Sequence, residues 1–172
     1  PDSAAIIATT GFTGRELFTL EDREQHLYQV GSMGCAAPMG LGVALNTDKR
    51  VVVIDGDGAA MMKLGALATV GAYAPNNLLH IVMDNAAYES TGGQPTVSAS
   101  VDFAGVAAAC GYKEAFTCDS LNGLEKIISE TVSRPGPHLV HMVIKAGHPD
   151  TLGRPTIKPP EVARRFKDFI TS

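Results

Sequence analysis

Short apolar runs alternate along the chain with stretches whose apolar residues recur at helical spacing. The apolar runs are five to nine residues long, which is typical of strands, and fall at 4–10, 26–30, 50–56, 78–85, 112–118 and 137–145. The run at 50–56, RVVVIDG, is apolar at successive positions, as expected of a central parallel strand with both faces buried. The helical patterns fall at 14–23, 34–46, 59–73, 102–111, 120–133 and 160–170.

This alternation predicts an α/β fold: a doubly wound, mostly parallel six-stranded sheet with helices on both faces. The 172 residues, 45% of them hydrophobic, suit one domain over 1–172. A net charge of −4 and the absence of a long apolar run give no reason to expect nucleic acid or a membrane as partner. Three widely spaced cysteines (Cys35, Cys110 and Cys118) indicate reduced thiols, and we expect a cytoplasmic protein.

Four of the expected strands end in segments rich in glycine or threonine. These segments are ATTGFTG (8–14), QVGSMG (29–34), IDGDG (54–58) and MDNAAYESTGG (83–93). Ligands of such sheets bind beyond the carboxyl ends of the strands, so the four segments should meet at one site. The last one opens the longest irregular stretch, 86–101, and a loop of that length usually carries function.

Asp57 stands between two glycines, where the backbone lets a ligand approach closely. A carboxylate there suits Mg²⁺, which prefers hard oxygen ligands and usually shares its shell with phosphates. The next strand end offers a second oxygen ligand in Asn85, with Asp84 beside it. A helix starting at Ala59 would direct its positive end at the same place. The residues therefore predict a site for Mg²⁺ and a diphosphate.

Gly-Asp-Gly at 56–58, followed after 25 residues by Asp84-Asn85, resembles the thiamin diphosphate motif, which has Asn-Asn at the second place. The resemblance implies the thiamin diphosphate-binding fold, with Mg²⁺ held by Asp57, Asn85 and the main-chain carbonyl of Ala87.

The segment VGSMGCAAPMGLGVAL (30–45) resembles the decarboxylase branch of that family. By this resemblance Met33 supports the bent cofactor, the Gly31 carbonyl accepts from its aminopyrimidine, and Thr9 and Thr10 contact the diphosphate. The full set of implied cofactor-binding residues is Thr9, Thr10, Gly31, Ser32, Met33, Gly56, Asp57, Gly58, Ala59, Ala60, Asn85, Ala87 and Tyr88.

Several further segments, among them TTGFTGREL, GGQPTV, ACGY and LGRPT, resemble phosphonopyruvate decarboxylase and sulfopyruvate decarboxylase. Both act on a small anionic 2-oxoacid. Cys35 and Tyr88 depart from the usual phosphonate pattern, and Asp84-Asn85 with Tyr-x-Ser-Thr-Gly at 88–92 favours the β subunit of the sulfonate enzyme. Phosphonopyruvate decarboxylase and a non-catalytic cofactor-binding chain stay open as alternatives.

Two rival classes are less well matched. The iron–sulfur subunits of 2-oxoacid oxidoreductases need closely spaced cysteines, which this chain lacks. A dinucleotide-binding domain needs Gly-x-Gly-x-x-Gly after its first strand, and TTGFTG is a poor match to it.

In the resembled family the glutamate that activates the cofactor lies on a separate pyrimidine-binding half. Five glutamates of this chain fit solvated helix faces or loop ends instead: Glu16, Glu21, Glu24, Glu89 and Glu114. We therefore expect a pyrimidine-binding partner subunit and a hetero-oligomer.

The residues that contact the substrate are less clearly marked. Candidate cations for the substrate's anionic group are Arg15, Lys63 and Arg154. Candidates for the mouth of the site are Ser90, Thr91, Gly92 and Gly93. Of the five histidines, His148 is the one that merits a test.

Overall fold

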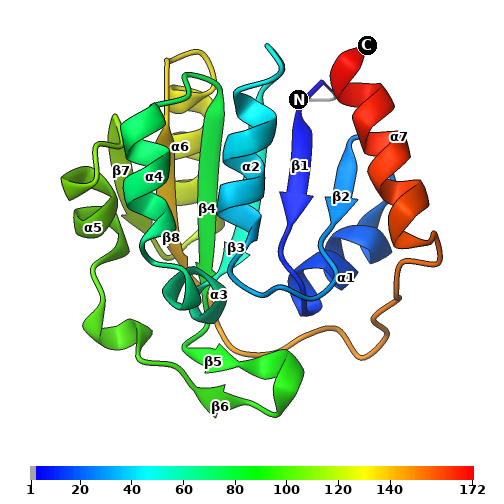
Figure 1. Cartoon of the computed structure of the whole chain (residues 1–172). Helices are drawn as coiled ribbons and strands as arrows, with labels where there is room; N and C mark the ends of the chain where they lie inside the picture. The colour runs from blue at the N-terminus through cyan, green and yellow to red at the C-terminus, as the bar shows by residue number, and fades with distance from the viewer. Residues whose placement is uncertain (1–2) are drawn as a thin grey trace.

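Six parallel strands form the main sheet of the computed structural model, which describes residues 3–172 (Figure 1). Their order is β2-β1-β3-β4-β8-β7. The strands are β1 (Ala5–Ala8), β2 (His26–Tyr28), β3 (Val51–Gly56), β4 (Leu78–Asp84), β7 (Glu114–Cys118) and β8 (His138–Val143). The predicted fold class and the six predicted strands are confirmed. No helix of the described residues is both long enough and apolar enough to span a bilayer.

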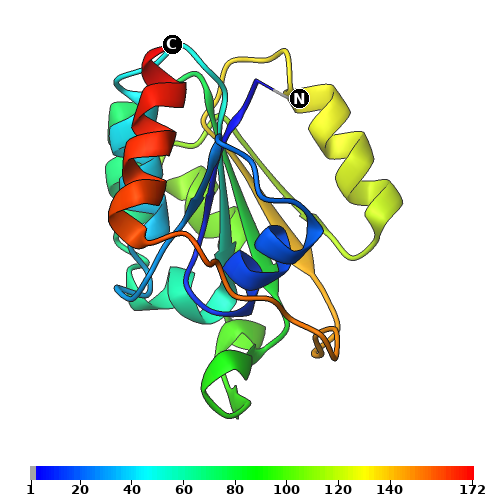
Figure 2. The same cartoon turned by 90° about the vertical axis from the view of Figure 1, so that its right-hand side faces the viewer.

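Helices cover both faces of the sheet (Figure 2). On one face lie α2 (Ala36–Ala44), α4 (Ala66–Tyr73), α5 (Phe103–Ala109) and α7 (Pro159–Thr171). On the other lie α1 (Phe12–Leu20) and α6 (Leu121–Thr131). The larger part of the core, which includes Val53, Val70, Phe103 and Leu139, lies under the first group because these strands and helices face one another with apolar side chains.

The single helix predicted over 59–73 is wrong, because the chain forms two helices there. The first, α3 (Asp57–Met62), begins at Asp57, and α4 begins only at Ala66. Between them Lys63 has φ −132° and Gly65 lowers the helical propensity of the junction. The break lets α3 sit at the end of β3 while α4 lies along the sheet.

The long stretch after β4 folds into a small hairpin that projects below the sheet (Figure 1). Its strands are β5 (Ala87–Tyr88) and β6 (Gln94–Pro95), joined through the 3-10 turn η1 (Glu89–Thr91) and followed by η2 (Ser98–Ser100). The amide of Thr96 donates to the carbonyl of Ala86 at 2.9 Å and brings the chain back to the end of β4.

The closing helix α7 is joined to the β2 edge of the sheet by an ion pair. The Arg165 guanidinium donates to both carboxylate oxygens of Asp22, at 2.7 and 2.9 Å, and the Tyr28 hydroxyl donates to Asp22 at 2.8 Å. The hydrogen bonds from Arg165 hold the pKa of Asp22 below its usual value. The pair is partly exposed, so its contribution to stability is modest.

Replacing Asp22 by asparagine should lower the free energy of unfolding by about 1 kcal/mol at pH 7. Because the folded-state pKa is depressed, this stabilisation is present above the ordinary carboxyl pKa of about 3.9 and is lost as pH falls through the folded-state value. Urea unfolding of the wild type and Asp22→Asn at pH 7 and at pH 3 should therefore show a difference that narrows in acid. Glu24→Gln, at an exposed position nearby, is the control, and a difference that is equal at both pH values contradicts the prediction.

Candidate functional site

A cavity of about 300 Å³ lies beyond the carboxyl ends of β1, β3 and β4. Of the thirteen cofactor-binding residues implied by the sequence, ten line it: Thr9, Thr10, Met33, Gly56, Asp57, Gly58, Ala59, Asn85, Ala87 and Tyr88. The other three lie outside the lining. Gly31 and Ser32 are exposed in the turn after β2, and Ala60 is buried in α3 against the core.

The Asp57 carboxylate sits at the point where β3 passes into α3 and is almost fully buried. Burial raises its pKa, and the nearby Asp84 carboxylate acts in the same direction. The Thr96 hydroxyl donates to Asp57 Oδ2 at 2.5 Å and opposes that shift. The Gly58 amide and the Ser98 hydroxyl act in the same direction as Thr96. These neutral donors do not balance the negative charge of a buried carboxylate, and a cation would balance it.

Asn85 follows β4 and has both ends of its amide held. Its Nδ2 donates to Glu89 Oε2 at 2.7 Å, and its Oδ1 accepts the Ala87 amide at 3.1 Å. Ala86 has φ +57°, a left-handed conformation that side chains rarely adopt, and this turns the chain from β4 into β5. The Glu89 contact orients the amide oxygen of Asn85, which is the atom that would serve as a metal ligand.

Thr9 directly follows β1, and its amide donates to the Ile54 carbonyl of β3 at 2.9 Å. Its hydroxyl is buried in the wall of the cavity, and no described residue accepts from it or donates to it. A buried hydroxyl without a partner is costly, so this one suits a ligand with acceptor oxygens. The amides in the first turn of α3 also have no acceptor within their helix.

Gly58 is required where it stands because Tyr88 packs directly on it. A Cβ added at Gly58 would lie 2.2 Å from Cε1 of the Tyr88 ring. This contact places the hairpin strand β5 against α3 and forms one wall of the cavity.

The donor set fits Mg²⁺ shared with a diphosphate. The described residues contain no group of three or more His, Cys, Asp or Glu side chains that would hold a metal by themselves. The available protein ligands are one carboxylate (Asp57), one amide oxygen (Asn85) and main-chain oxygens such as that of Ala87. Mg²⁺ suits such a sparse set of oxygens, because it usually takes its remaining ligands from water and phosphate.

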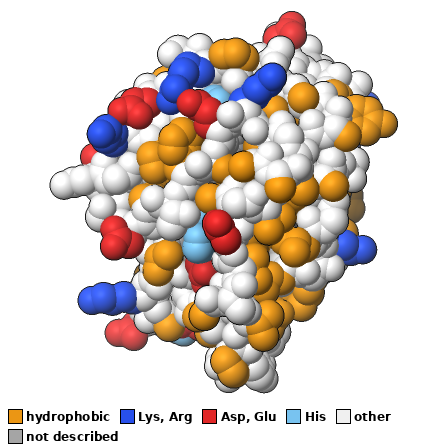
Figure 3. Space-filling view, turned by 90° about the vertical axis from the view of Figure 1, so that its left-hand side faces the viewer, with side chains coloured by type: hydrophobic (Ala, Val, Ile, Leu, Met, Phe, Trp, Pro, Cys, Tyr) orange, Lys and Arg blue, Asp and Glu red, His pale blue; other side chains and the backbone are white. Residues whose placement is uncertain are grey.

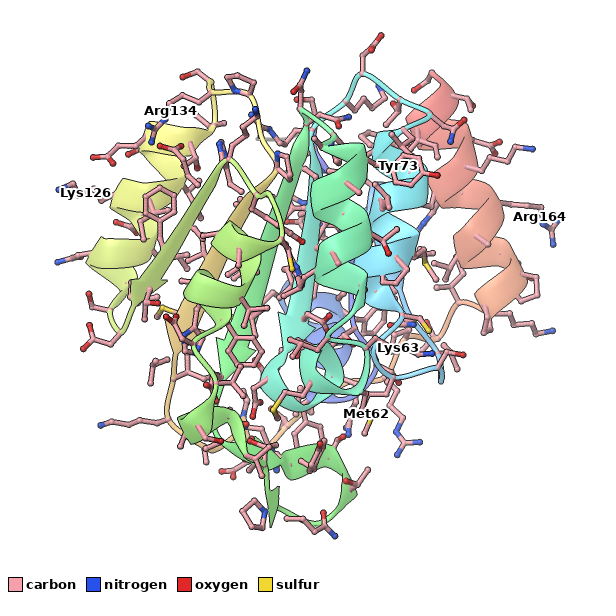
Figure 4. The ribbon with its side chains drawn as sticks, turned by 60° about the vertical axis from the view of Figure 1, so that its left-hand side comes forward. Met62, Lys63, Tyr73, Lys126, Arg134 and Arg164 are labelled. Atoms are coloured by element: carbon pink, nitrogen blue, oxygen red, sulfur yellow. The ribbon has the colours of Figure 1, made fainter. Side chains whose placement is uncertain are left out.

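The three candidate cations for a substrate anion do not line this cavity. Arg15 donates to the carbonyls of Leu152 and Gly153 at 2.7 and 2.9 Å, and with Arg154 it lines a neighbouring cavity that shares Thr10 to Phe12 with the first. Lys63 is exposed at the end of α3, beside Met62 (Figure 4). The hydrogen bonds of Arg15 therefore attach the segment before α7 to α1, which is a structural role.

Two glutamates expected on solvated surfaces instead line the cavity. Glu16 on α1 is half-buried, and its burial and the Glu89 carboxylate raise its pKa, while His148 lowers it. The interpretation of Glu16 and Glu89 as solvated residues is wrong because α1 and the hairpin meet over the strand ends. The other three (Glu21, Glu24 and Glu114) lie outside the cavity lining.

Four partners around the site had little signal in the sequence, and a fifth residue, His148, was singled out there without an assigned role. Thr96, Ser98 and Glu89 all come from the stretch 86–101, where the length of the loop and the family resemblance of segments 88–92 and 92–97 assigned none of them a role. His141 on β8 contacts Asp84 at 2.8 Å (Nε2 to Oδ2), and nothing in its sequence neighbourhood pointed to that contact. His148 stacks edge-on against Phe12, with ring centroids 4.4 Å apart, at the rim of the cavity.

Comparison with known proteins shows a consistent set of relatives. Residues 9–142 match the family described as thiamine pyrophosphate enzyme, C-terminal TPP binding domain. The chain is 55% identical to phosphonopyruvate decarboxylase of Streptomyces viridochromogenes over all of its own length, and spans 43% of that relative. It is 39% identical to sulfopyruvate decarboxylase subunit beta of Methanothermobacter thermautotrophicus, over 84% of this chain and 76% of the relative.

Solved structures agree on the fold. The benzoylformate decarboxylase of Polynucleobacter necessarius superposes with a TM-score of 0.71 at 17% identity, over 84% of this chain and 30% of that one. At that identity the match concerns the fold alone.

Proposed function

The chain belongs to the thiamine pyrophosphate enzymes, among the relatives of phosphonopyruvate and sulfopyruvate decarboxylases, and we propose that it supplies the Mg²⁺ and diphosphate half of a decarboxylase site. The substrate would be a pyruvate with an anionic group on C3, and the products CO₂ and an aldehyde. The observation that carries this proposal is the cavity at the strand ends, which brings Asp57, Asn85, Ala87 and Thr9 together.

Each residue then has a definite task. Asp57, Asn85 and the Ala87 carbonyl hold Mg²⁺, and Thr9 and Thr10 donate to the diphosphate. The other five cavity-lining residues of the cofactor-binding set shape the cavity: Met33, Gly56, Gly58, Ala59 and Tyr88. When bound, thiamin diphosphate supplies the electron sink for the electrons that CO₂ leaves behind. The chain's own part is to hold, bend and shield that group.

A pyrimidine-binding partner completes the site in this proposal. Glu89 already accepts from Asn85, so it is held at the metal side of the cavity. Glu16 lines the same cavity beside it, so both glutamates lie where the diphosphate half of the site is proposed. Apolar side chains are exposed on neighbouring elements, including Met39 on α2, Met62 on α3 and Tyr73 on α4. Figure 3 shows hydrophobic side chains gathered along one side of the molecule, apart from most of the charged ones. An exposed apolar face of this kind supports a protein partner.

For the substrate, the greater identity to phosphonopyruvate decarboxylase favours 3-phosphonopyruvate over the 3-sulfopyruvate that the sequence patterns led us to expect. Sulfopyruvate is the second candidate, supported by Asp84-Asn85 and Tyr88 of the sulfonate-type pattern. The two anions differ in charge, since a phosphonate can carry two negative charges and a sulfonate only one.

The test uses the intact protein from its source organism, with every chain that co-purifies. CO₂ release is measured with thiamin diphosphate and Mg²⁺ from 3-phosphonopyruvate and from 3-sulfopyruvate, each alone and in competition. A clear preference in kcat/KM for the phosphonate supports the first candidate, and the reverse preference supports the second. Tight cofactor binding without turnover of either compound would contradict the decarboxylase proposal and favour a non-catalytic cofactor-binding chain.

A further inference from the structure

We propose that Thr96 is a positioning residue for Asp57, and that Ser98, Asp84 and His141 hold Thr96 in place. This inference rests on the proposed function, because it concerns the role of Asp57 as a metal ligand. These five side chains form a continuous chain of contacts from the cavity to β8, which we call the Asp57–His141 relay. Its successive distances are 2.5, 3.1, 2.8 and 2.8 Å.

The first contact of the relay has a fixed direction. The Asp57 carboxylate is an acceptor when ionised, so the Thr96 hydroxyl must donate its single proton to Oδ2. The Ser98 hydroxyl likewise donates its single proton to Asp84 Oδ1 at 2.8 Å. Because both hydroxyl protons are given to carboxylates, the 3.1 Å contact between Thr96 Oγ1 and Ser98 Oγ carries no hydrogen. Thr96 is instead tied to Ser98 through the Ser98 amide, which donates to Thr96 Oγ1 at 3.4 Å. Thr96 is therefore the side-chain donor with the short hydrogen bond to Asp57, while Ser98, which also lies close to Asp57, makes its short hydrogen bond to Asp84.

The far end of the relay is anchored in the sheet. Asp84 and His141 lie on β4 and β8, and the pair is mostly buried, with side-chain exposures of 9% and 11%. The His141 ring also packs against Phe103, with centroids 5.0 Å apart. Ser98 is 3% exposed. Because neighbouring strands of the sheet carry both members of the pair, the relay gives the surface hairpin a fixed attachment point.

The same hairpin brings Thr96 to Asp57. The Thr96 amide donates to the Ala86 carbonyl at 2.9 Å, which closes the hairpin directly beyond the end of β4. With Oδ2 held by Thr96, Asp57 is left with its other oxygen to face a cation. A hydrogen bond from a residue outside the metal shell fixes the orientation of a ligand in this way, and its loss typically weakens metal affinity about 10–100-fold.

The experiment compares Thr96→Val, which removes the donor and keeps the shape, with Thr96→Ser, which keeps the donor. In the intact protein, we measure thiamin diphosphate binding as a function of Mg²⁺ concentration, and the EPR spectrum of Mn²⁺ as a direct probe of the metal shell. Thr96→Val should weaken metal-dependent binding about 10–100-fold. Thr96→Ser should restore most of that affinity. Thr171→Val, exposed at the end of α7 on the β1–β2 side of the sheet, is the matched control and should bind as the wild type does.

Thermal unfolding of the metal-free variants separates positioning from folding. Thr96→Ser and the control should melt close to the wild type, and Thr96→Val, which removes a donor from a buried carboxylate, should melt somewhat lower and still be folded at the temperature of the binding assay. Equal affinity of Thr96→Val and wild type would overturn the inference while leaving the proposed function intact. Equal weakening in Thr96→Val and Thr96→Ser would also overturn it, because the hydroxyl would not be the cause. A wild type that binds no thiamin diphosphate in a Mg²⁺-dependent way would overturn the proposed function itself, and this inference with it.

Discussion

Replacing Asp57 by asparagine is expected to weaken Mg²⁺-dependent binding of thiamin diphosphate by more than about 100-fold, beyond the loss typical of residues outside the metal shell. The variant keeps the size of the side chain and removes its charge. Asp57 is the one carboxylate in the proposed ligand set, so no other protein group in that set balances the charge of Mg²⁺. Titration of the intact protein with cofactor at several Mg²⁺ concentrations measures the effect.

The same substitution should weaken cofactor binding but leave the metal-free fold as stable as the wild type or more stable. Burial raises the pKa of Asp57, so the ionised carboxylate destabilises the metal-free fold at pH 7 relative to its protonated form. The favourable contribution of the neutral group is present below the ordinary carboxyl pKa and is lost as pH rises through the raised folded-state value. Metal-free Asp57→Asn should therefore melt at or above the melting temperature of the metal-free wild type. Adding Mg²⁺ and thiamin diphosphate should raise the melting temperature of the wild type but not that of the variant.

Asp48→Asn is the control, because Asp48 is exposed just before β3, at the amino-terminal ends of the strands and opposite to the cavity. It should leave cofactor binding and its metal dependence unchanged. A variant of Asp57 that binds cofactor as tightly as the wild type would contradict its role as metal ligand.

Replacing Gly71 by alanine is expected to destabilise the fold by about 3 kcal/mol or more, at the upper end of the usual cost of overpacking. Gly71 lies on α4 at its contact with the end of α5. A Cβ there would lie 1.8 Å from the carbonyl oxygen of Cys110 and 2.6 Å from its carbonyl carbon. Those atoms are backbone, so no side-chain rotation relieves the clash and the two helices must separate.

Gly42→Ala is the matched control, since Gly42 is also a helical glycine but has no atom within 4 Å of the added Cβ. Alanine should stabilise that position of α2 by about 0.5–1 kcal/mol. Urea unfolding of both variants measures the contrast. Similar stabilities for Gly71→Ala and the wild type would contradict the close packing of α4 on α5.

Local sequence was sufficient for most of the fold. The β-branched run at β3 is buried at Val51 and Val53, and its neighbours in the sheet are β1 and β4, as a central strand requires. The glycines around Asp57 also marked the place where β3 turns into a helix. The break between α3 and α4 was missed because apolar residues continue through it at helical spacing, whereas Gly65 and the position of α4 on the sheet end the first helix.

The amino-acid sequence alone determined the six strands of the main sheet and the two candidate ligands, Asp57 and Asn85. The spacing of apolar residues, the ends of the strands and the chemistry of each side chain are all local properties of the chain. Which distant side chains serve those ligands depends on the folded chain. Thr96 reaches Asp57 across 39 positions of sequence, and His141 reaches Asp84 across 57. Such contacts depend on the order of strands in the sheet and on the closure of a hairpin. Neither of these can be recognised from the spacing of apolar and polar residues along the sequence.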